Sequence, residues 1–174
     1  ITGCTGTILY INSCNIVLDC QNHYLQSAGY YGINNTGFDN VTIKDCRINM
    51  SDNGRGIYLR NLCNNTIENN TVDVYSSYGL SLYNTSYSNF TDNEITSNQR
   101  ALQILQSHNN SFSGGSVIAE TAYDYFLESI GSGNSFRNTN FTSSRQVNFE
   151  DTESWFNYNN DSSGGIWLNT SLDE

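Results

Sequence analysis

The sequence predicts an all-β fold, a right-handed parallel β-helix of about six to seven coils closed by a C-terminal cap. Three observations favour this solenoid: an apolar position that recurs about every two dozen residues, a second strand pattern in phase with it, and no amphipathic helical periodicity. Asn, Asp, Ser and Gly separate the apolar segments, and the chain contains no proline that would interrupt strand ladders.

The repeat is clearest at one core position, which recurs at steps of 25, 24, 23, 22 and 24 residues. Its members are Leu18, Ile43, Ile67, Phe90, Phe112 and Phe136. A second apolar position follows five residues later, at Ile48, Val72, Ile95, Val117 and Phe141. A separate strand signal keeps the same period, at Gly32-Ile33, Gly56–Leu59, Gly79–Leu82 and Ala101–Ile104. Agreement across several positions indicates one repeated structural unit.

Each coil is expected to contribute two short strands with alternating inward apolar residues, joined by polar turns. One coil cannot bury its apolar side alone, so stacking at about 4.8 Å per coil creates the continuous core. Asn70 and Asn93 fall at equivalent turn positions of successive coils. We therefore expect their amides to bond to each other in a ladder inside the turn.

These residues resemble the parallel β-helix repeat family, which includes pectate-lyase-like enzymes, the periplasmic accessory protein of nitrous oxide reductase and many archaeal surface proteins. The segment Leu18–Leu25 followed by Gly32-Ile33 looks like the opening coil of the archaeal surface members, and Asn40–Cys46 looks like the next coil. The resemblance covers roughly residues 8 to 142. It implies the fold strongly and the function weakly, because function depends on sites carried by the fold.

The register divides the chain into β-helix coils over residues 1–145 and a terminal coil, cap or subunit-contact segment over 146–174. In this last part Val147–Phe149 could supply a further coil, and the aromatic segments Trp155-Phe156 and Ile166–Leu168 look like terminal strands. A solenoid end exposes unpaired backbone and apolar side chains, which such a segment would cover.

Charge limits the partners. The net charge is −10 with only seven Lys and Arg, so a nucleic-acid footprint is not expected, and acidic polysaccharides are disfavoured unless calcium bridges them. No apolar run approaches the roughly 20 residues of a membrane-spanning helix. The first ten residues lack the basic start and apolar core of a signal peptide, so we expect a mature or excised chain.

Sequons and cysteines favour an extracellular or cell-surface location. Eleven Asn residues begin N-x-S/T triplets: Asn34, Asn40, Asn49, Asn64, Asn69, Asn84, Asn89, Asn109, Asn140, Asn160 and Asn169. All are candidate N-glycosylation sites, although many triplets arise by chance in an Asn-rich chain. Among the five cysteines, Cys20 and Cys46 occupy nearly the same turn position of neighbouring coils and form the first disulfide candidate, while Cys4 could close the N-terminal end. Cys14 and Cys63 share a register two coils apart, too far for a direct bridge, and the odd number of cysteines leaves at least one thiol unpaired or available to another chain.

Catalytic chemistry is not indicated. Asp45, Asn69 and Asp92 share one coil position, which puts the two aspartates about 9.6 Å apart, near the upper limit for an inverting glycosidase pair. Turn formation is the simpler interpretation of these residues. Arg55 and Arg100 share a place before the second strand and could contact a ligand. His23 and His108 fit no metal spacing, so we predict no catalytic residue, metal or cofactor.

Six tyrosines cluster near the second strand, and Tyr30, Tyr31, Tyr78 and Tyr83 are candidates for surface binding. The function that these features favour is a non-catalytic structural or adhesive surface glycoprotein that assembles into a sheath, layer or fibre. Its expected partners are further copies, other envelope proteins and glycans. The alternatives are a carbohydrate-binding β-helix module and a polysaccharide lyase or glycoside hydrolase.

Overall fold

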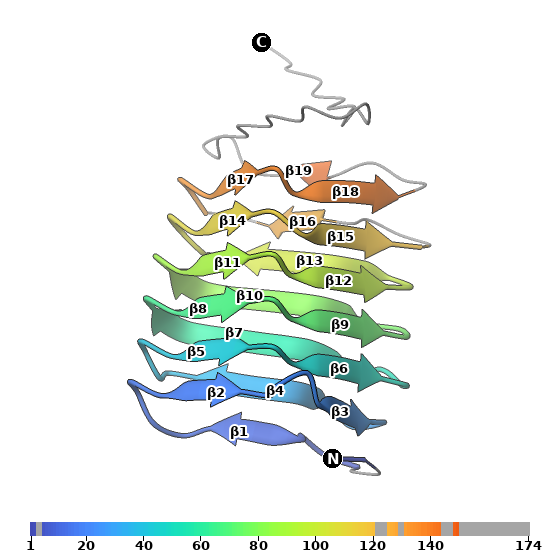
Figure 1. Cartoon of the computed structure of the whole chain (residues 1–174). Coiled ribbons are helices and arrows are strands. Elements are labelled where there is room, and N and C mark those ends of the chain that lie inside the picture. The colour runs from blue at the N-terminus through green and yellow to red at the C-terminus, as the bar shows by residue number, and fades with distance from the viewer. Residues whose placement is uncertain (3–4, 121–124, 129–130, 144–147, 150–174) are drawn as a thin grey trace.

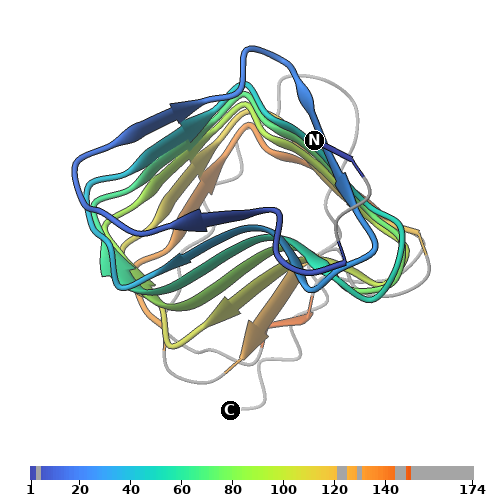
Figure 2. The same cartoon turned by 90° about the horizontal axis from the view of Figure 1, so that it is seen from below.

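A computed structural model describes residues 1–2, 5–120, 125–128, 131–143 and 148–149. These residues form short parallel strands stacked level on level, with the N-terminus at one end of the stack (Figure 1). Seen along its axis, the chain winds around a closed interior bounded by three sheets (Figure 2). The predicted fold class, an all-β parallel solenoid, is confirmed.

Every coil passes through the three sheets in the same order. Sheet 1 contains β1 (Leu9–Ile11), β4 (Tyr31–Thr36), β7 (Arg55–Cys63), β10 (Tyr78–Ser86), β13 (Arg100–Leu105), β16 (Tyr125–Glu128) and β19 (Asn148–Phe149). Sheet 2 contains β2 (Val17–Asp19), β5 (Thr42–Lys44), β8 (Thr66–Glu68), β11 (Asn89–Thr91), β14 (Ser111–Ser113) and β17 (Ser135–Arg137). Sheet 3 contains β3 (Tyr24–Ser27), β6 (Arg47–Met50), β9 (Thr71–Val74), β12 (Glu94–Ser97), β15 (Ser116–Ala119) and β18 (Asn140–Ser143).

The strand register follows the predicted repeat. In sheet 2 the paired residues run in order through Leu18, Ile43, Ile67, Phe90, Phe112 and Phe136. In sheet 3 the positions five residues later are paired in the same way, from Ile48 to Phe141. In sheet 1, Ile33 pairs with Ile57, and Leu80 pairs with both Ile57 and Leu102. Each column of the sequence repeat is therefore a column of neighbouring side chains.

The expectation of two strands per coil is wrong, because each complete coil has three. The extra division falls between sheets 2 and 3, where Asp45, Asn69 and Asp92 have φ between 51° and 54°. A left-handed φ turns the chain away from the strand direction, and at each of these three residues one strand ends and the next begins two residues later. Asn and Asp tolerate this conformation better than other non-glycine residues, which explains their recurrence at the bend.

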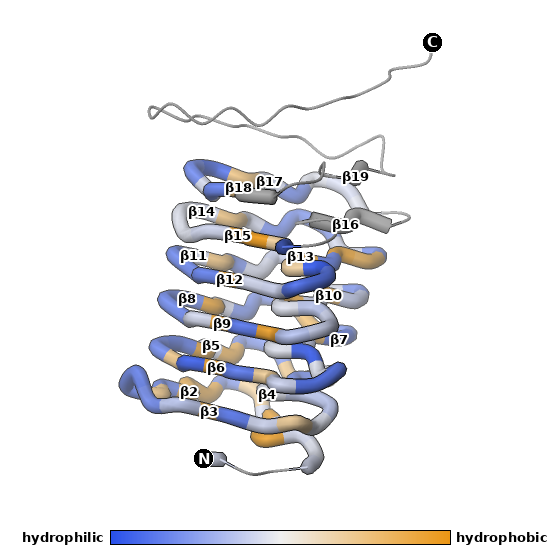
Figure 3. Tube along the Cα trace, turned by 90° about the vertical axis from the view of Figure 1, so that its right-hand side faces the viewer, coloured by the Kyte–Doolittle hydropathy of each residue, from blue (hydrophilic) through white to orange (hydrophobic). Residues whose placement is uncertain are grey.

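Apolar side chains fill the interior along the whole stack. Phe90, Phe112 and Phe136 stack with ring centroids 4.4 and 4.5 Å apart, and all three are buried. Hydrophobic stretches recur from level to level between hydrophilic turns (Figure 3). Gly56 leaves no room for a side chain, because a Cβ atom there would collide with Val72 and with the carbonyl of Gly79. The glycine that opens the strand is therefore fixed by close packing of successive coils.

Buried amides bond along the stack at two bends. Asn70 donates from Nδ2 to Oδ1 of Asn93 over 2.9 Å, and both side chains are buried, as the sequence predicted. A second ladder, which the sequence analysis missed, lies between sheets 1 and 2 and comprises Asn65, Ser88, Asn110 and Asn134. These side chains satisfy backbone groups that a sharp bend leaves without strand partners.

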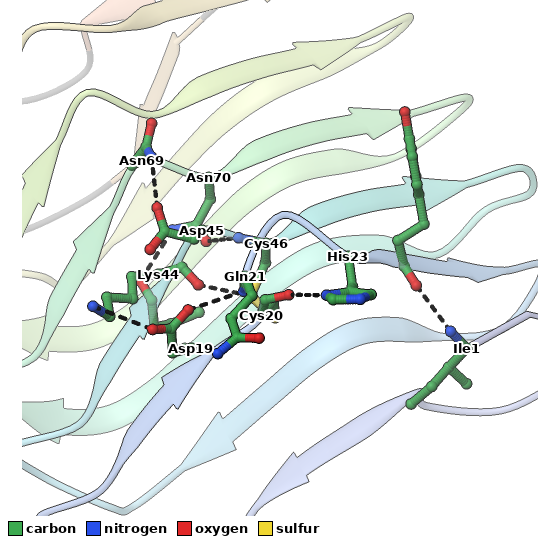
Figure 4. Close-up of a disulfide and its surroundings, with 12 residues drawn as sticks. Ile1, Asp19, Cys20, Gln21, His23, Lys44, Asp45, Cys46, Asn69 and Asn70 are labelled. Atoms are coloured by element: carbon green, nitrogen blue, oxygen red, sulfur yellow. Dashed lines mark hydrogen bonds and ion pairs between the residues drawn. A yellow bond between two sulfur atoms is a disulfide. The ribbon is translucent and has the colours of Figure 1, made fainter.

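The disulfide candidates are partly described. Cys20 and Cys46 are joined in a disulfide, with their Cα atoms 4.7 Å apart on neighbouring coils (Figure 4). Cys46 also donates its backbone N–H to Asn70, so the bridge ends beside the first amide ladder. Cys4, the third candidate, lies outside the described residues. The same holds for residues 150–174, which contain the aromatic segments expected to form a cap.

Candidate functional site

The outer side of sheet 1 carries an array of tyrosines and arginines. Tyr31 pairs with Arg55 and Tyr78 pairs with Arg100, while the Arg55 guanidinium lies 5.1 Å from the Tyr78 ring centroid. One column therefore alternates tyrosine and arginine across four successive coils. We call the array the Tyr–Arg face, and its residues are Tyr31, Arg55, Tyr58, Arg60, Tyr78, Tyr83 and Arg100.

Ring faces within the Tyr–Arg face are already in contact with neighbouring side chains. Tyr31 stacks on Tyr58 at 5.0 Å between centroids, and Arg55 lies over the Tyr58 ring at 4.8 Å. Arg60 covers the Tyr83 ring at 5.1 Å. Such contacts place each guanidinium over a tyrosine ring. The face therefore offers guanidinium N–H groups and phenol hydroxyls to a partner.

Two polar side chains on the outer side of sheet 1 are buried and bond to each other. Ser81 and Gln103 occupy the central outward column of β10 and β13, yet they are only 1% and 5% exposed. The Ser81 hydroxyl donates to Oε1 of Gln103 over 2.8 Å. Arg100 donates to the hydroxyl of Tyr78, which fixes one arginine laterally. Hydrogen bonds between neighbouring coils thus hold some side chains of sheet 1 in defined positions.

Positive charge is concentrated on this face. It contains three of the seven basic residues of a chain with net charge −10, and β4, β7, β10 and β13 contain no Asp or Glu. Arg55 and Arg60 have no carboxylate within ion-pair distance among the described residues. By contrast, Lys44 in sheet 2 pairs with Asp19 at 3.4 Å. The Tyr–Arg face is therefore a local cationic surface on an acidic protein.

Several of the residues singled out from sequence meet here. Tyr31, Tyr78 and Tyr83 belong to the face, and Arg55 and Arg100 flank Tyr78. Tyr30 precedes β4 in a turn, is 75% exposed and does not belong to the array. Arg60 was missed, although it precedes Tyr83 by 23 residues, which is the local coil length and a usable signal.

The proposed carboxylate pair is engaged in turn structure. Nδ2 of Asn69 donates to Oδ1 of Asp45 over 2.5 Å, and the backbone N–H of Asp92 donates to the Ser113 carbonyl. All three residues of this column adopt left-handed φ at the bend between sheets 2 and 3. The geometry agrees with turn formation as their role.

The histidines and free cysteines are separate from one another. His23 contacts the Cys20 carbonyl through Nδ1, and His108 contacts Ser132 in a different coil. Cys14 and Cys63 are free. Burial raises the pKa of the Cys63 thiol, and the neighbouring Asp39 carboxylate raises that pKa further. The described residues contain no cluster of three or more His, Cys, Asp or Glu side chains.

Several sequons follow from the geometry of the coil. Five sequon asparagines have left-handed φ: Asn84 lies within β10, and the other four lie between strands, namely Asn40, Asn64, Asn69 and Asn109. The third residue of a sequon then falls on the next strand, where Thr42 and Thr66 begin β5 and β8. A left-handed Asn followed by a strand Thr or Ser is thus favoured by the fold itself. Asn64, Asn89 and Asn109 are exposed, whereas Asn160 and Asn169 lie outside the described residues.

A family model described as periplasmic copper-binding protein (NosD) matches residues 1–170. The chain belongs to the NosD family. Neither the curated proteins nor the solved structures gave a significant match. The family is described by binding and not by a reaction, and its periplasmic description is consistent with an envelope or extracellular location. No helix able to cross a membrane occurs in the described part of this NosD-family chain.

Copper would require converging imidazole, thiolate or thioether groups. The described residues do not meet this requirement. His23 and His108 lie in different coils, Met50 is 1% exposed within the core, and the raised pKa of Cys63 disfavours its thiolate. The described coils therefore do not provide a set of side chains that fits copper.

Proposed function

We propose that this NosD-family chain is a non-catalytic, extracytoplasmic adhesive scaffold that recognises an envelope component through its Tyr–Arg face. The single observation that carries the proposal is the stacked array of three arginines and four tyrosines on strands without Asp or Glu. A rigid solenoid holds such side chains at fixed spacing, which lowers the entropy lost on binding. Tyr and Arg are also the residue types most enriched where binding energy is concentrated.

The Cys20–Cys46 disulfide supports the extracytoplasmic part of the proposal, since disulfides persist in oxidising compartments. The non-catalytic part is supported by the role of Asp45 in the turn, where its carboxylate accepts a hydrogen bond from Asn69. A hydrolase would need carboxylates directed at a common reacting atom.

Polar recognition is favoured over stacking on sugar rings. The carbohydrate-binding alternative predicted from sequence relied on exposed aromatic faces, but the Tyr58 and Tyr83 faces are covered by guanidinium groups. A partner with carboxylates or other hydrogen-bond acceptors fits the remaining groups better.

Envelope binding tests this proposal. The purified protein would be incubated with envelopes isolated from the producing organism, and the sedimented fraction measured. The face variant combines Arg55→Gln, Arg60→Gln and Arg100→Gln. The control variant combines Lys44→Gln, Arg47→Gln and Arg137→Gln, which removes the same charge from sheets 2 and 3. We expect at least about a fivefold loss of retention for the face variant only, equivalent to about 1 kcal/mol. Equal retention of the two variants would contradict the proposal.

N-glycosylation belongs to the same proposal and has its own test. Intact-mass analysis of protein from its native source would show glycan mass on peptides containing exposed sequon residues such as Asn64, Asn89 or Asn109. If the native protein carried no added glycan mass, the glycosylation proposal would be wrong, and the recognition proposal would be unaffected.

A further inference from the structure

Acidic side chains gather on the opposite side of the solenoid from the Tyr–Arg face. Glu68 ends β8, Asp73 lies in β9, Asp92 occupies the bend before β12 and Glu94 begins β12. Glu68, Asp92 and Glu94 lie at or beside the bend between sheets 2 and 3, which faces away from sheet 1 in the axial view (Figure 2), and Asp73 lies further along sheet 3, one residue before the end of β9. We call them the acidic corner. Three of the four are exposed, and Glu68 is half-buried.

Charge is thus separated across the two middle coils, residues 55–98. Their basic residues are Arg55 and Arg60, both on the Tyr–Arg face, and their four carboxylates all form the acidic corner. The nearest basic residues on the corner side are Lys44 and Arg47, one coil below, where Lys44 is paired with Asp19. The middle of the molecule is therefore dipolar from one side to the other.

The two surfaces also coincide in height along the axis. Arg55 and Arg60 share a coil with Glu68 and Asp73, and Arg100 begins the coil directly above Asp92 and Glu94. A second copy moved sideways without rotation would place its acidic corner opposite the Tyr–Arg face, within about one 4.8 Å rung. No change of register along the axis is needed.

We propose that the partner of the Tyr–Arg face is the acidic corner of a second copy of this chain. This inference rests on the proposed function and names the envelope component as the protein itself. Carboxylates of the corner accept hydrogen bonds from the guanidinium edges and phenol hydroxyls of the face. Stacking on tyrosine rings holds the guanidinium planes in place, which favours bidentate contact.

Such a contact is head-to-tail and leaves one free surface at each end. Repetition of a heterologous contact produces an open row of molecules with parallel axes. Each individual contact is modest, because exposed ion pairs are weakened by water and salt. Long-range repulsion between copies of net charge −10 is largely screened at about 0.15 M salt, where the Debye length is about 8 Å. We expect concentration-dependent association that salt near 1 M, with a screening length of about 3 Å, reverses.

Charge reversal and mixing provide the test. A face-reversed variant carries Arg55→Glu, Arg60→Glu and Arg100→Glu, and a corner-reversed variant carries Glu68→Lys, Asp73→Lys and Glu94→Lys. Sedimentation velocity over a concentration series would measure association at about 0.15 M salt. We expect association of the wild type, a decrease of at least about tenfold for either variant alone, and recovery when the two variants are mixed. Recovery requires complementary surfaces and cannot arise from misfolding.

Circular dichroism and thermal unfolding would establish that each variant keeps the fold, and reversal of Arg137 to Glu, three coils above Glu68, provides a control away from the face. A wild-type chain that stays monomeric at all concentrations would overturn this inference. So would two folded variants that fail to associate on mixing. If the chain stays monomeric while the Gln face variant still loses envelope retention, only self-association is wrong and the recognition proposal stands.

Discussion

Inside the solenoid, Phe90, Phe112 and Phe136 stack with centroids 4.4 and 4.5 Å apart, whereas outside it Tyr31 and Tyr58 stack at 5.0 Å. The phenylalanines are register partners in one column, whereas Tyr31 pairs with Arg55 and contacts Tyr58 diagonally across the two strands. The phenylalanines are at most 3% exposed, but the tyrosines are half-buried and lie beside arginines. A repeated ring therefore stabilises the core on the inner side of the wall, and diagonal ring contacts between coils form part of the surface on the outer side. Because the phenylalanines are more deeply buried, we expect their stack to contribute more to the free energy of unfolding than the tyrosine stack does.

The largest effect is expected from Phe112→Ala. Phe112 contacts a ring on each side, so its removal leaves a cavity that costs about 3–5 kcal/mol of unfolding free energy. The matched change outside, Tyr58→Ala, should cost about 1 kcal/mol because the ring is partly solvated. Chemical denaturation of the two variants measures both losses. Equal losses would show that the Tyr–Arg face is chiefly structural.

A smaller loss is expected from Asn70→Ala in the inner ladder. The substitution removes the acceptor of the Cys46 N–H and a donor to the Ile43 carbonyl. Buried groups without partners cost about 1–3 kcal/mol each, and we expect about 2–3 kcal/mol in total. Asn89→Ala, at an exposed position of β11, is the control and should change stability by at most about 0.5 kcal/mol. If Asn70→Ala left the free energy of unfolding unchanged, the ladder would be present at the bend without stabilising it.

The smallest effect is expected from Asp19, whose exposed carboxylate makes the stability of the fold depend on pH. A backbone hydrogen bond from Gln21 lowers the pKa of Asp19, and Lys44 lowers that pKa further. A carboxylate with a lowered pKa in the folded state stabilises the fold above its unfolded pKa, about 4, and this contribution disappears as pH falls through the folded pKa. Unfolding measured from pH 7 to 2 should therefore show a small acid-side loss in the wild type that Asp19→Asn lacks. Identical pH profiles would contradict the assignment.

Much of the fold could be predicted because its information is periodic. The column from Leu18 to Phe136 appears as apolar residues spaced 22 to 25 apart, and strand pairing reproduces it. The Cys20–Cys46 bridge and the Asn70–Asn93 ladder were accessible for the same reason, since residues one coil apart become neighbours. Local irregularity was harder to predict. The second ladder alternates Asn65 with Ser88, and that change of residue type hides the column.

The candidate site was only partly accessible. Tyr31, Tyr78 and Tyr83 could be selected as aromatic surface residues, but their contacts depend on which side of the strand each residue faces. Arg60 and Tyr83 become partners only when coils of unequal length are aligned strand by strand. The contacts between guanidinium groups and ring faces are the reason that the proposed partner presents groups that accept hydrogen bonds and not sugar rings that stack.

By itself, the sequence determined the solenoid, its register and the neighbours along each column, because a coil period of about two dozen residues converts separation in the chain into contact. Only the tertiary structure decided that the repeat bends twice between sheets 1 and 3, at residues such as Asn64 and Asn69 with left-handed φ. Those bends direct the arginines to one side and Glu68, Asp73 and Glu94 to the other. Backbone dihedral angles at a few polar residues therefore determine which charges share a face, and periodicity carries no information about that direction.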